Sequence, residues 1–318
     1  MSRHQRAEID TMLRARPKPQ GPQAIEDMRA GFAAMMAGMI VPAGIRTTQA
    51  ELGGRRALLV EPEGEPGDGV ILYFHGGSFV LGAPETALSL TANLVRRTGW
   101  PAYSPDYRLA PEHPFPAAIE DTVAAYRALL ERGVDPSAIV FAGDSAGGGL
   151  TVTTCLRARA EGLPMPAALV AFSPGVDATR TGESMDTKAG IDPFFTREGF
   201  VPTTAMYLAG QDPHQELVSP AVAADLTGFP PTLLQVGTNE VLLDDSTRLA
   251  ARAWAAGVDV VLDVTADVPH VFQAFAGRLE EADQALDRAA FFLAQHVRRP
   301  VDQAGQAKSA RGASAVSR

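Results

Sequence analysis

Apolar and polar residues follow a regular order along this chain, and that order predicts the fold. Short apolar runs, typical of strands in a buried sheet, occupy residues 70–74, 101–105, 138–142, 167–172, 232–236 and 258–264. Helical patterns lie between and after them, at residues 85–98, 117–132, 147–161, 244–256 and 280–297. Upstream, polar and apolar residues alternate on either side of Gly53-Gly54, which predicts a hairpin of residues 46–52 and 55–61. Strands that alternate with helices predict an α/β fold, with a largely parallel sheet covered on both faces.

Four segments fall outside this alternation. Residues 1–22 are polar and rich in proline, which predicts a loosely held arm, and residues 24–41 suit a helix rich in methionine. Residues 177–228 combine Gly, Pro and aromatic residues with weak helical patterns, so we interpret them as an insertion. Residues 299–318 are rich in Ala, Ser, Gln and Gly, a composition that predicts disorder.

Composition narrows the class of protein. A chain of 318 residues with 46% hydrophobic and 20% charged residues is typical of a soluble globular protein with a large core. The net charge of −9 argues against sequence-independent binding of nucleic acid, which requires a basic face. Cys155 is the only cysteine, so neither an intramolecular disulfide nor a thiolate metal cluster is expected.

The N-terminal region carries no recognisable targeting signal. Residues 1–6 are basic, but acidic residues follow them where a signal peptide would have an apolar core. The apolar stretch at residues 31–45 is shorter than the roughly 20 residues that span a bilayer. We therefore predict a cytoplasmic protein without stable membrane insertion.

The most informative motif is Gly143-Asp144-Ser145-Ala146-Gly147, between the strand at 138–142 and the helix at 147–161. It has the G-x-S-x-G pattern of a nucleophile elbow, in which a tight strand-to-helix turn exposes the serine hydroxyl above the sheet. A side chain at either glycine would clash where strand and helix nearly touch. Taken alone, the five residues fit an ordinary Gly/Ser-rich turn equally well.

A serine nucleophile needs a base, and His270 is our prediction. In hydrolases with such an elbow, the acid and then the base follow the serine along the chain. His270 lies in a loop after the last predicted strand, whereas His214 lies inside the insertion. His296 lies in the amphipathic closing helix beside arginines, where a solvated surface role is expected.

The acid that orients the base is expected after a strand between Ser145 and His270. Glu240 follows the strand at 232–236 most closely and is our choice. Asp244 and Asp245 remain alternatives, but both start a helix, where capping and the helix dipole suffice to explain them.

An oxyanion hole needs backbone amides that point at one spot. His75-Gly76-Gly77 directly follows the strand at 70–74, so the amides of Gly76, Gly77 and Ala146 are the predicted donors. We interpret His75 as a brace for this loop, and the loop taken alone as compatible with an ordinary turn.

Together these motifs resemble the hormone-sensitive-lipase family of α/β-hydrolases, the bacterial family IV esterases. The resemblance covers residues 45–297 and rests on His75-Gly76-Gly77, residues 106–112, Pro116-Ala117-Ala118 with Asp121, residues 143–148 and Pro269-His270. The chain is similar to the branch with monoterpene lactone hydrolases and short-chain esterases, some of which use Glu as the acid. Many members have a third glycine where this chain has Ser78. For residues 106–112 we expect a structural role, bracing the oxyanion loop through buried charge pairs.

The resemblance implies a domain organisation. Residues 1–45 would form an N-terminal arm and cap helices, and residues 46–298 an α/β-hydrolase domain whose insertion at 177–228 completes a cap over Ser145. The methionines of residues 24–41 suit either core packing or an adaptable pocket wall, and the implied cap favours the wall. Expected pocket residues are Phe32, Met36, Phe195 and Met206.

The sequence thus predicts a serine carboxylesterase for small esters with short acyl groups, or for lactones. Ser145, Glu240 and His270 would form the triad, and neither a metal nor an organic cofactor is required. An amidase or peptidase on the same triad is an alternative, as is a hydrolase-fold receptor without turnover, which should lack a triad member. A homodimer is compatible with the sequence.

Overall fold

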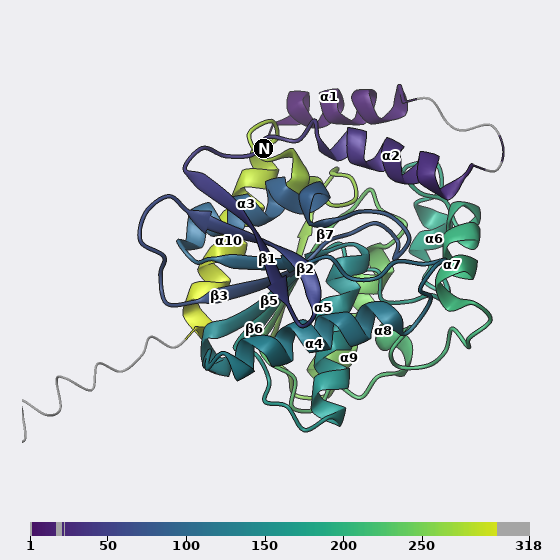
Figure 1. The fold of residues 1–318 in the computed structure, drawn as a ribbon. Coiled ribbons are helices and arrows are strands. Elements are labelled where there is room, and N and C mark those ends of the chain that lie inside the picture. Colours follow the sequence, from purple (N-terminus) through teal and green to yellow (C-terminus); the bar gives the residue numbers. More distant parts are fainter. Residues whose placement is uncertain (1, 17–20, 22, 298–318) are drawn as a thin grey trace, which may run out of the picture.

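The computed structural model describes residues 2–16, 21 and 23–297 and contains one sheet of eight strands (Figure 1). Its order is β1-β2-β4-β3-β5-β6-β7-β8. The strands are β1 (Ile45–Leu52), β2 (Arg55–Pro62), β3 (Val70–Phe74), β4 (Ala102–Pro105), β5 (Ile139–Asp144), β6 (Ala168–Phe172), β7 (Thr232–Gly237) and β8 (Val260–Thr265). The strands from β4 to β8 pair in parallel, while β1 and β2 pair antiparallel at one edge. The largely parallel sheet predicted from the alternation is confirmed.

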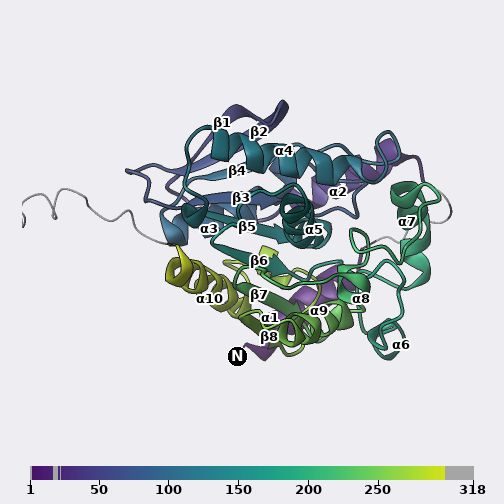
Figure 2. The same cartoon turned by 90° about the horizontal axis from the view of Figure 1, so that it is seen from below.

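Helices cover both faces of the sheet, as the apolar strands require. The helices are α1 (Arg3–Arg14), α2 (Ile25–Met36), α3 (Leu88–Thr98), α4 (Ala117–Glu131), α5 (Ala146–Ala160), α6 (Ser184–Thr187), α7 (Val201–Leu208), α8 (Pro220–Ala223), α9 (Leu243–Ala255) and α10 (Glu280–His296), and the 3-10 turns are η1 (Pro84–Ala87), η2 (Pro136–Ala138), η3 (Glu198–Phe200) and η4 (Phe272–Phe275). One core layer packs α3 and α10 against the sheet, and the other packs α4, α5 and α9 (Figure 2). Every residue of β5 and β7 is buried, which explains their unbroken apolar runs. Among the described residues, no helix is long and apolar enough to cross a membrane.

The prediction of a loosely held N-terminal arm is wrong for residues 3–14, which form α1. Ile9 and Leu13 lie one turn apart on the same face of this helix and are buried in a cluster with Phe272 and Phe275. Arg14 donates hydrogen bonds to the carbonyl oxygens of Gly190 and Ile191. The polar composition of the segment concealed this narrow apolar stripe, so the first helix is docked.

The insertion between β6 and β7 has the weak helical character that its sequence predicts. It contains only the short helices α6, α7 and α8 and the turn η3. In Figure 1, α1 and α2 run across one end of the molecule, and α6 and α7 lie below α2 at the same end. The predicted disordered tail, residues 299–318, lies outside the described residues.

Two glycines allow β3, β5 and α5 to approach one another at the elbow. A Cβ added to Gly147 would lie 1.9 Å from the carbonyl oxygen of Phe74 and 2.5 Å from that of His75. At Gly143 it would lie 2.4 Å from the carbonyl oxygen of Gly147. These neighbours are backbone atoms of the central sheet and helix, so they cannot move aside cheaply. The steric argument made from the motif is confirmed.

Replacing Gly147 with alanine is therefore expected to destabilise the protein by about 1–3 kcal/mol or more, because the added methyl must displace the central strand. Thermal unfolding followed by circular dichroism would show a lowered Tm. Gly31→Ala is the matched control, since nothing lies within 4 Å of a Cβ at this position in α2. Equal melting temperatures for the two variants would contradict the packing described here.

Candidate active site

Ser145 lies on the turn that joins β5 to α5. Its backbone has φ 52° and ψ −118°, a conformation that non-glycine residues rarely adopt. The turn is held from outside, because the Ser145 amide donates to the carbonyl oxygen of Phe172 at 2.8 Å and its carbonyl accepts from Gly149 and Gly175. Such strain costs on the order of 1–3 kcal/mol and persists only where surrounding contacts enforce it. This is the strained turn that the motif predicts.

Glu240 and His270 form a buried pair after β7 and β8. The Nδ1 atom of His270 lies 2.8 Å from Oε2 of Glu240, whose side chain is completely buried. The other carboxylate oxygen accepts hydrogen bonds from the Gly237 amide at 2.6 Å and the Ser173 hydroxyl at 2.8 Å. Glu240 is thereby fixed from two strands, and it fixes the imidazole ring in turn.

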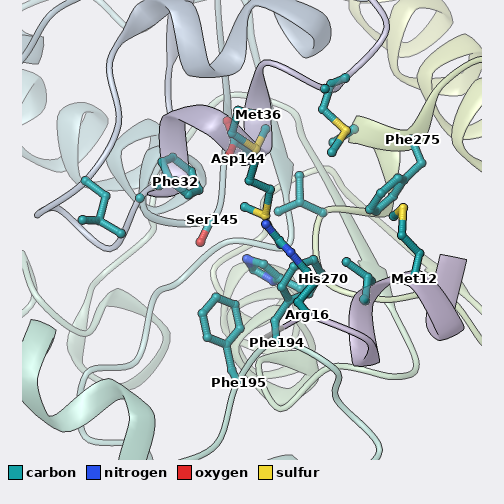
Figure 3. Close-up of a pocket in the computed structure, with 18 of the residues that line it drawn as sticks. Met12, Arg16, Phe32, Met36, Asp144, Ser145, Phe194, Phe195, His270 and Phe275 are labelled. Atoms are coloured by element: carbon teal, nitrogen blue, oxygen red, sulfur yellow. The ribbon is translucent and has the colours of Figure 1, made fainter. Parts of the chain in front are cut away.

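Burial lowers the pKa of His270, but the negative charge of Glu240 and its hydrogen bond outweigh that effect, so the pKa is raised above its ordinary value. The other ring nitrogen, Nε2, is buried and has no hydrogen-bond partner among the described residues. His270 and Ser145 line the same pocket, into which both side chains point in Figure 3. Catalytic hydrogen bonds are often long in unliganded enzymes, so this arrangement suits a base that engages the serine when substrate is bound.

The alternative acids occupy other positions. Asp244 accepts a hydrogen bond from the Ser184 amide at 2.8 Å, and Asp245 accepts from the amides of Val176 and Asp177. Both carboxylates hold the insertion against α9. Neither is bonded to His270, so Glu240 is the candidate acid on geometry as well as on sequence position.

The loop after β3 differs in detail from the prediction. Gly77 and Ser78 line the pocket with Ser145, whereas Gly76 does not. Gly76 instead packs on Asp144, since an added Cβ would lie 2.2 Å from its Oδ2. Ala146 borders a second cavity beside Ser145. The candidate oxyanion donors are thus Gly77, Ser78 and Ala146, and Gly76 lies behind them.

Sequence reasoning noted Ser78 only as a departure from the family pattern. Its φ of 54° is left-handed, a conformation that glycine adopts without strain. The missing third glycine was therefore the signal that this residue takes an unusual backbone conformation at the site.

Asp144 is a buried carboxylate that the sequence analysis did not assign. The hydroxyl of Tyr73 donates to its Oδ1 at 2.9 Å. Burial raises the pKa of Asp144 to about 6, against the opposing effect of this hydrogen bond. Its contacts join β3, the elbow and the Gly76 loop, so it positions the loop relative to Ser145.

His75 braces the same loop, as expected. Its ring stacks on Tyr107 with centroids 4.1 Å apart, and its Nδ1 lies 2.8 Å from the Gly76 carbonyl oxygen. Burial lowers the pKa of His75 to about 4, so the ring is neutral at pH 7. The Tyr107 hydroxyl also donates to the His75 carbonyl at 2.7 Å. Residues 106–112 thus support the loop mainly through an aromatic ring and a hydroxyl, while their ion pairs, such as Arg108 with Asp121, lie farther out.

The pocket at Ser145 has a volume of about 360 Å³ and a largely apolar wall (Figure 3). Methionines and aromatic rings of α1, α2, the segment after α2, the insertion and η4 line it: Met12, Phe32, Met35, Met36, Met39, Phe194, Phe195 and Phe275. Phe32, Met36 and Phe195, which the sequence analysis names as pocket residues, are among these lining residues. Met12 was missed because its segment was expected to be a loose arm.

Met206 is a correction, because it does not line this pocket. Its neighbours on α7, Thr203 and Tyr207, face the second cavity. Met206 packs instead beside Val80 and Ala110 in a separate apolar cluster. The helical repeat puts residues 203 and 207 on one face and turns residue 206 away from it.

Asp192, also missed, ties the insertion to the loop that carries Glu240. Its Oδ1 accepts from the amides of Phe194 at 2.7 Å and Phe195 at 3.0 Å, and its Oδ2 accepts from the Val241 amide at 2.9 Å. The ring of Phe195 consequently meets the His270 ring edge to face, with centroids 4.9 Å apart. The insertion and the catalytic loop are thereby held as one unit.

Within the described ranges, no group of three or more His, Cys, Asp or Glu side chains is placed to hold a metal ion.

Comparisons with known proteins show which proteins this chain is similar to. A family model described as the alpha/beta hydrolase fold matches residues 71–274. An acetyl-hydrolase of Streptomyces hygroscopicus is 42% identical over 223 residues, which are 70% of this chain and 74% of the relative. An esterase of Acinetobacter venetianus is 38% identical over 224 residues, with the same shares of the two chains.

Solved structures extend the similarity to nearly the whole chain. The crystal structure of an esterase from the bacterial hormone-sensitive lipase family superimposes with a TM-score of 0.88. It is 42% identical in sequence, and the match covers 94% of this chain and 100% of that one.

The buried pair makes a prediction about pH. Because the base must be neutral, activity falls as the pH drops through the pKa of His270, which Glu240 raises. Glu240→Gln removes the charge, so kcat should fall by about two to four orders of magnitude, and the acid limb of the residual kcat/KM profile should move to lower pH.

Asp244→Asn is the matched control, since it neutralises a nearby carboxylate at the start of α9 that contacts Ser184 rather than His270. It should lower the Tm and leave the acid limb in place. An acid limb that moves in Asp244→Asn but not in Glu240→Gln would show that Asp244, and not Glu240, orients His270.

Proposed function

The chain belongs to the alpha/beta hydrolase family and is a carboxylic ester hydrolase, and from this premise we propose that it works as a serine esterase through an acyl-enzyme on Ser145. One observation carries the proposal. His270 is hydrogen-bonded to buried Glu240 through Nδ1, while its unpartnered Nε2 belongs to the pocket that Ser145 also lines. A serine, a histidine and an orienting carboxylate in this relation are the parts of a catalytic triad.

In the first half of the reaction, the Ser145 hydroxyl transfers its proton to Nε2 of His270 as Oγ bonds to the ester carbonyl carbon. Glu240 holds the ring so that Nδ1 keeps its proton, and its charge stabilises the imidazolium that forms. The negative charge on the former carbonyl oxygen is stabilised by the amides of Gly77, Ser78 and Ala146. Ala146 is the first residue of α5, so the helix dipole adds to this effect. The bond to the alcohol oxygen then breaks, and His270 gives its proton to the leaving alcohol.

In the second half, water takes the place of the alcohol. His270 accepts a proton from this water as its oxygen attacks the acyl carbon, and the carboxylic acid leaves when Ser145 recovers its proton. The pairing of Asp144 with Tyr73 keeps the oxyanion loop in place through both halves.

Substrates are small esters with short acyl groups, or lactones of similar size. The apolar pocket of about 360 Å³ supports a compact, apolar substrate, near the lower end of ligand pockets in general. Methionines from α1 and α2 supply an adaptable wall, because thioether side chains repack around ligands of different shape.

A fluorophosphonate probe tests the nucleophile directly. It should label the wild-type protein at Ser145, as located by peptide mass spectrometry, and labelling should disappear in Ser145→Ala. Ser137 is the control hydroxyl, because it lies on η2 and bonds to Asp135 rather than to the triad, so Ser137→Ala should still be labelled. Labelling that survives in Ser145→Ala would move the nucleophile elsewhere.

The substrate size is tested with p-nitrophenyl esters of increasing acyl length. We expect kcat/KM to be highest for acyl groups of two to four carbons and to fall by about tenfold or more for a twelve-carbon acyl group, because the space beside Ser145 does not hold the excess methylenes. A profile that rises steadily with chain length would indicate a lipase instead.

A further inference from the structure

A second cavity borders the nucleophile and differs in chemistry from the large pocket. The two share only Ser78 and Ser145 among their lining residues. The second cavity measures about 40 Å³, and its lining includes Arg180, Thr203 and Thr204. Since a cavity of roughly 10–15 Å³ holds one water, this one accommodates only a few heavy atoms. A small cavity with one arginine and two threonines in an otherwise largely apolar wall thus adjoins the large apolar pocket at Ser145.

Arg180 lines this cavity, and its side chain has hydrogen-bond donors without an acceptor in the described part of the chain. Its Nε and Nη1 atoms are buried and have no hydrogen-bond partner among the described residues. The guanidinium carbon lies 4.1 Å from the centroid of the Phe200 ring, and Nη1 is 3.9 Å from the nearest carboxylate oxygen, that of Asp245. Buried guanidinium groups are ordinarily fully hydrogen-bonded, so these donors call for an explanation.

Holding its own loop explains Arg180 only in part, because Nη1 lies 3.9 Å from Asp245 and forms no hydrogen bond with it. A closer ion pair fastens this loop to α9 and joins Arg248 to Asp177 at 2.7 Å. The Asp177 carboxylate also accepts from the Thr179 amide at 2.9 Å, and the carbonyl of Arg180 accepts a hydrogen bond from Arg197. These contacts fix the backbone around Arg180, whose φ is 54°, without using its guanidinium.

The proposed mechanism decides which part of an ester reaches this cavity. The leaving alcohol must lie beside Nε2 of His270, which gives it a proton. His270 lines the large pocket but not the small cavity. The alcohol therefore occupies the large apolar pocket, and the acyl group extends from Ser145 toward Arg180.

We propose that Arg180 is a specificity-determining residue that selects small acyl groups carrying an oxygen on the carbon next to the carbonyl, such as 2-alkoxyacyl and 2-hydroxyacyl groups. The guanidinium donates to that oxygen, and the cavity limits the acyl group to a few heavy atoms. This inference rests on the proposed function, because it takes Ser145 and His270 as nucleophile and base.

The test compares p-nitrophenyl methoxyacetate with p-nitrophenyl butyrate, which differ only by the exchange of one methylene for oxygen. For each ester, kcat/KM is divided by the rate constant of hydroxide hydrolysis, which removes the difference in intrinsic reactivity. The wild type should prefer methoxyacetate by about tenfold or more in corrected kcat/KM. The free energy of a hydrogen bond to a charged group corresponds to a ratio of at least this size. Arg180→Met should bring the preference to about one, and Arg180→Lys should retain part of it.

Arg159→Met is the matched control, because this arginine donates to the carbonyl oxygens of Asp225 and Thr227 in the same insertion and does not line the cavity. It should leave the wild-type preference unchanged. A corrected preference near one in the wild type, or an unchanged preference in Arg180→Met, overturns the inference. If Arg180→Met does not fold, the wild-type and Arg180→Lys values still decide.

The variant Ser145→Ala distinguishes a failure of the inference about Arg180 from a failure of the proposed function. Hydrolysis of butyrate that persists in Ser145→Ala overturns the proposed mechanism and, with it, the assignment of the small cavity to the acyl group. Hydrolysis that depends on Ser145 but shows no preference overturns the role of Arg180 alone.

Discussion

The close approach of β3, β5 and α5 is the constraint on which the rest of the site depends. Gly147 comes so near the carbonyl of Phe74 that no side chain fits between them. This contact leaves Ser145 no room to follow either the strand or the helix, and its backbone takes the φ of 52° that projects it above the sheet. The cost of that conformation is met by the surrounding parallel sheet, whose strands are locked by buried contacts on both faces.

A second constraint acts through buried polar groups. The carboxylate of Glu240 accepts from the Gly237 amide and the Ser173 hydroxyl, and that hydroxyl in turn accepts from the Val271 amide, beside His270. Loops that follow β6, β7 and β8 are therefore joined through one carboxylate. In a region of low dielectric, losing any partner leaves a buried polar group unsatisfied, so the network holds the imidazole in a single orientation.

The parts that the sequence predicts well are those governed by local rules. The buried strands, the elbow and the order of Ser145, Glu240 and His270 follow from patterns that are contiguous or fixed along the chain. Contacts between distant segments could not be predicted in this way. The docking of α1 depends on Ile9 and Leu13 meeting η4, and the role of Asp192 depends on where the insertion folds back onto Val241. Met206 was misplaced for a related reason, because the register of α7 on its neighbours decides which residues face a cavity.

The proposed catalytic residues and the wall of the large pocket are held by different kinds of interaction. The elbow and the carboxylate network use backbone atoms and buried hydrogen bonds, which tolerate little change. The large pocket is instead walled by methionines on α1 and α2, whose flexible side chains can repack without moving the sheet. The small cavity combines both kinds of wall, because Arg180 comes from the insertion and Ser145 from the elbow. By our inference, a substitution at Arg180 changes which acyl group is accepted and leaves the pairing of Glu240 with His270 intact, because the guanidinium has no hydrogen bond to either residue and the carboxylate near it is that of Asp245.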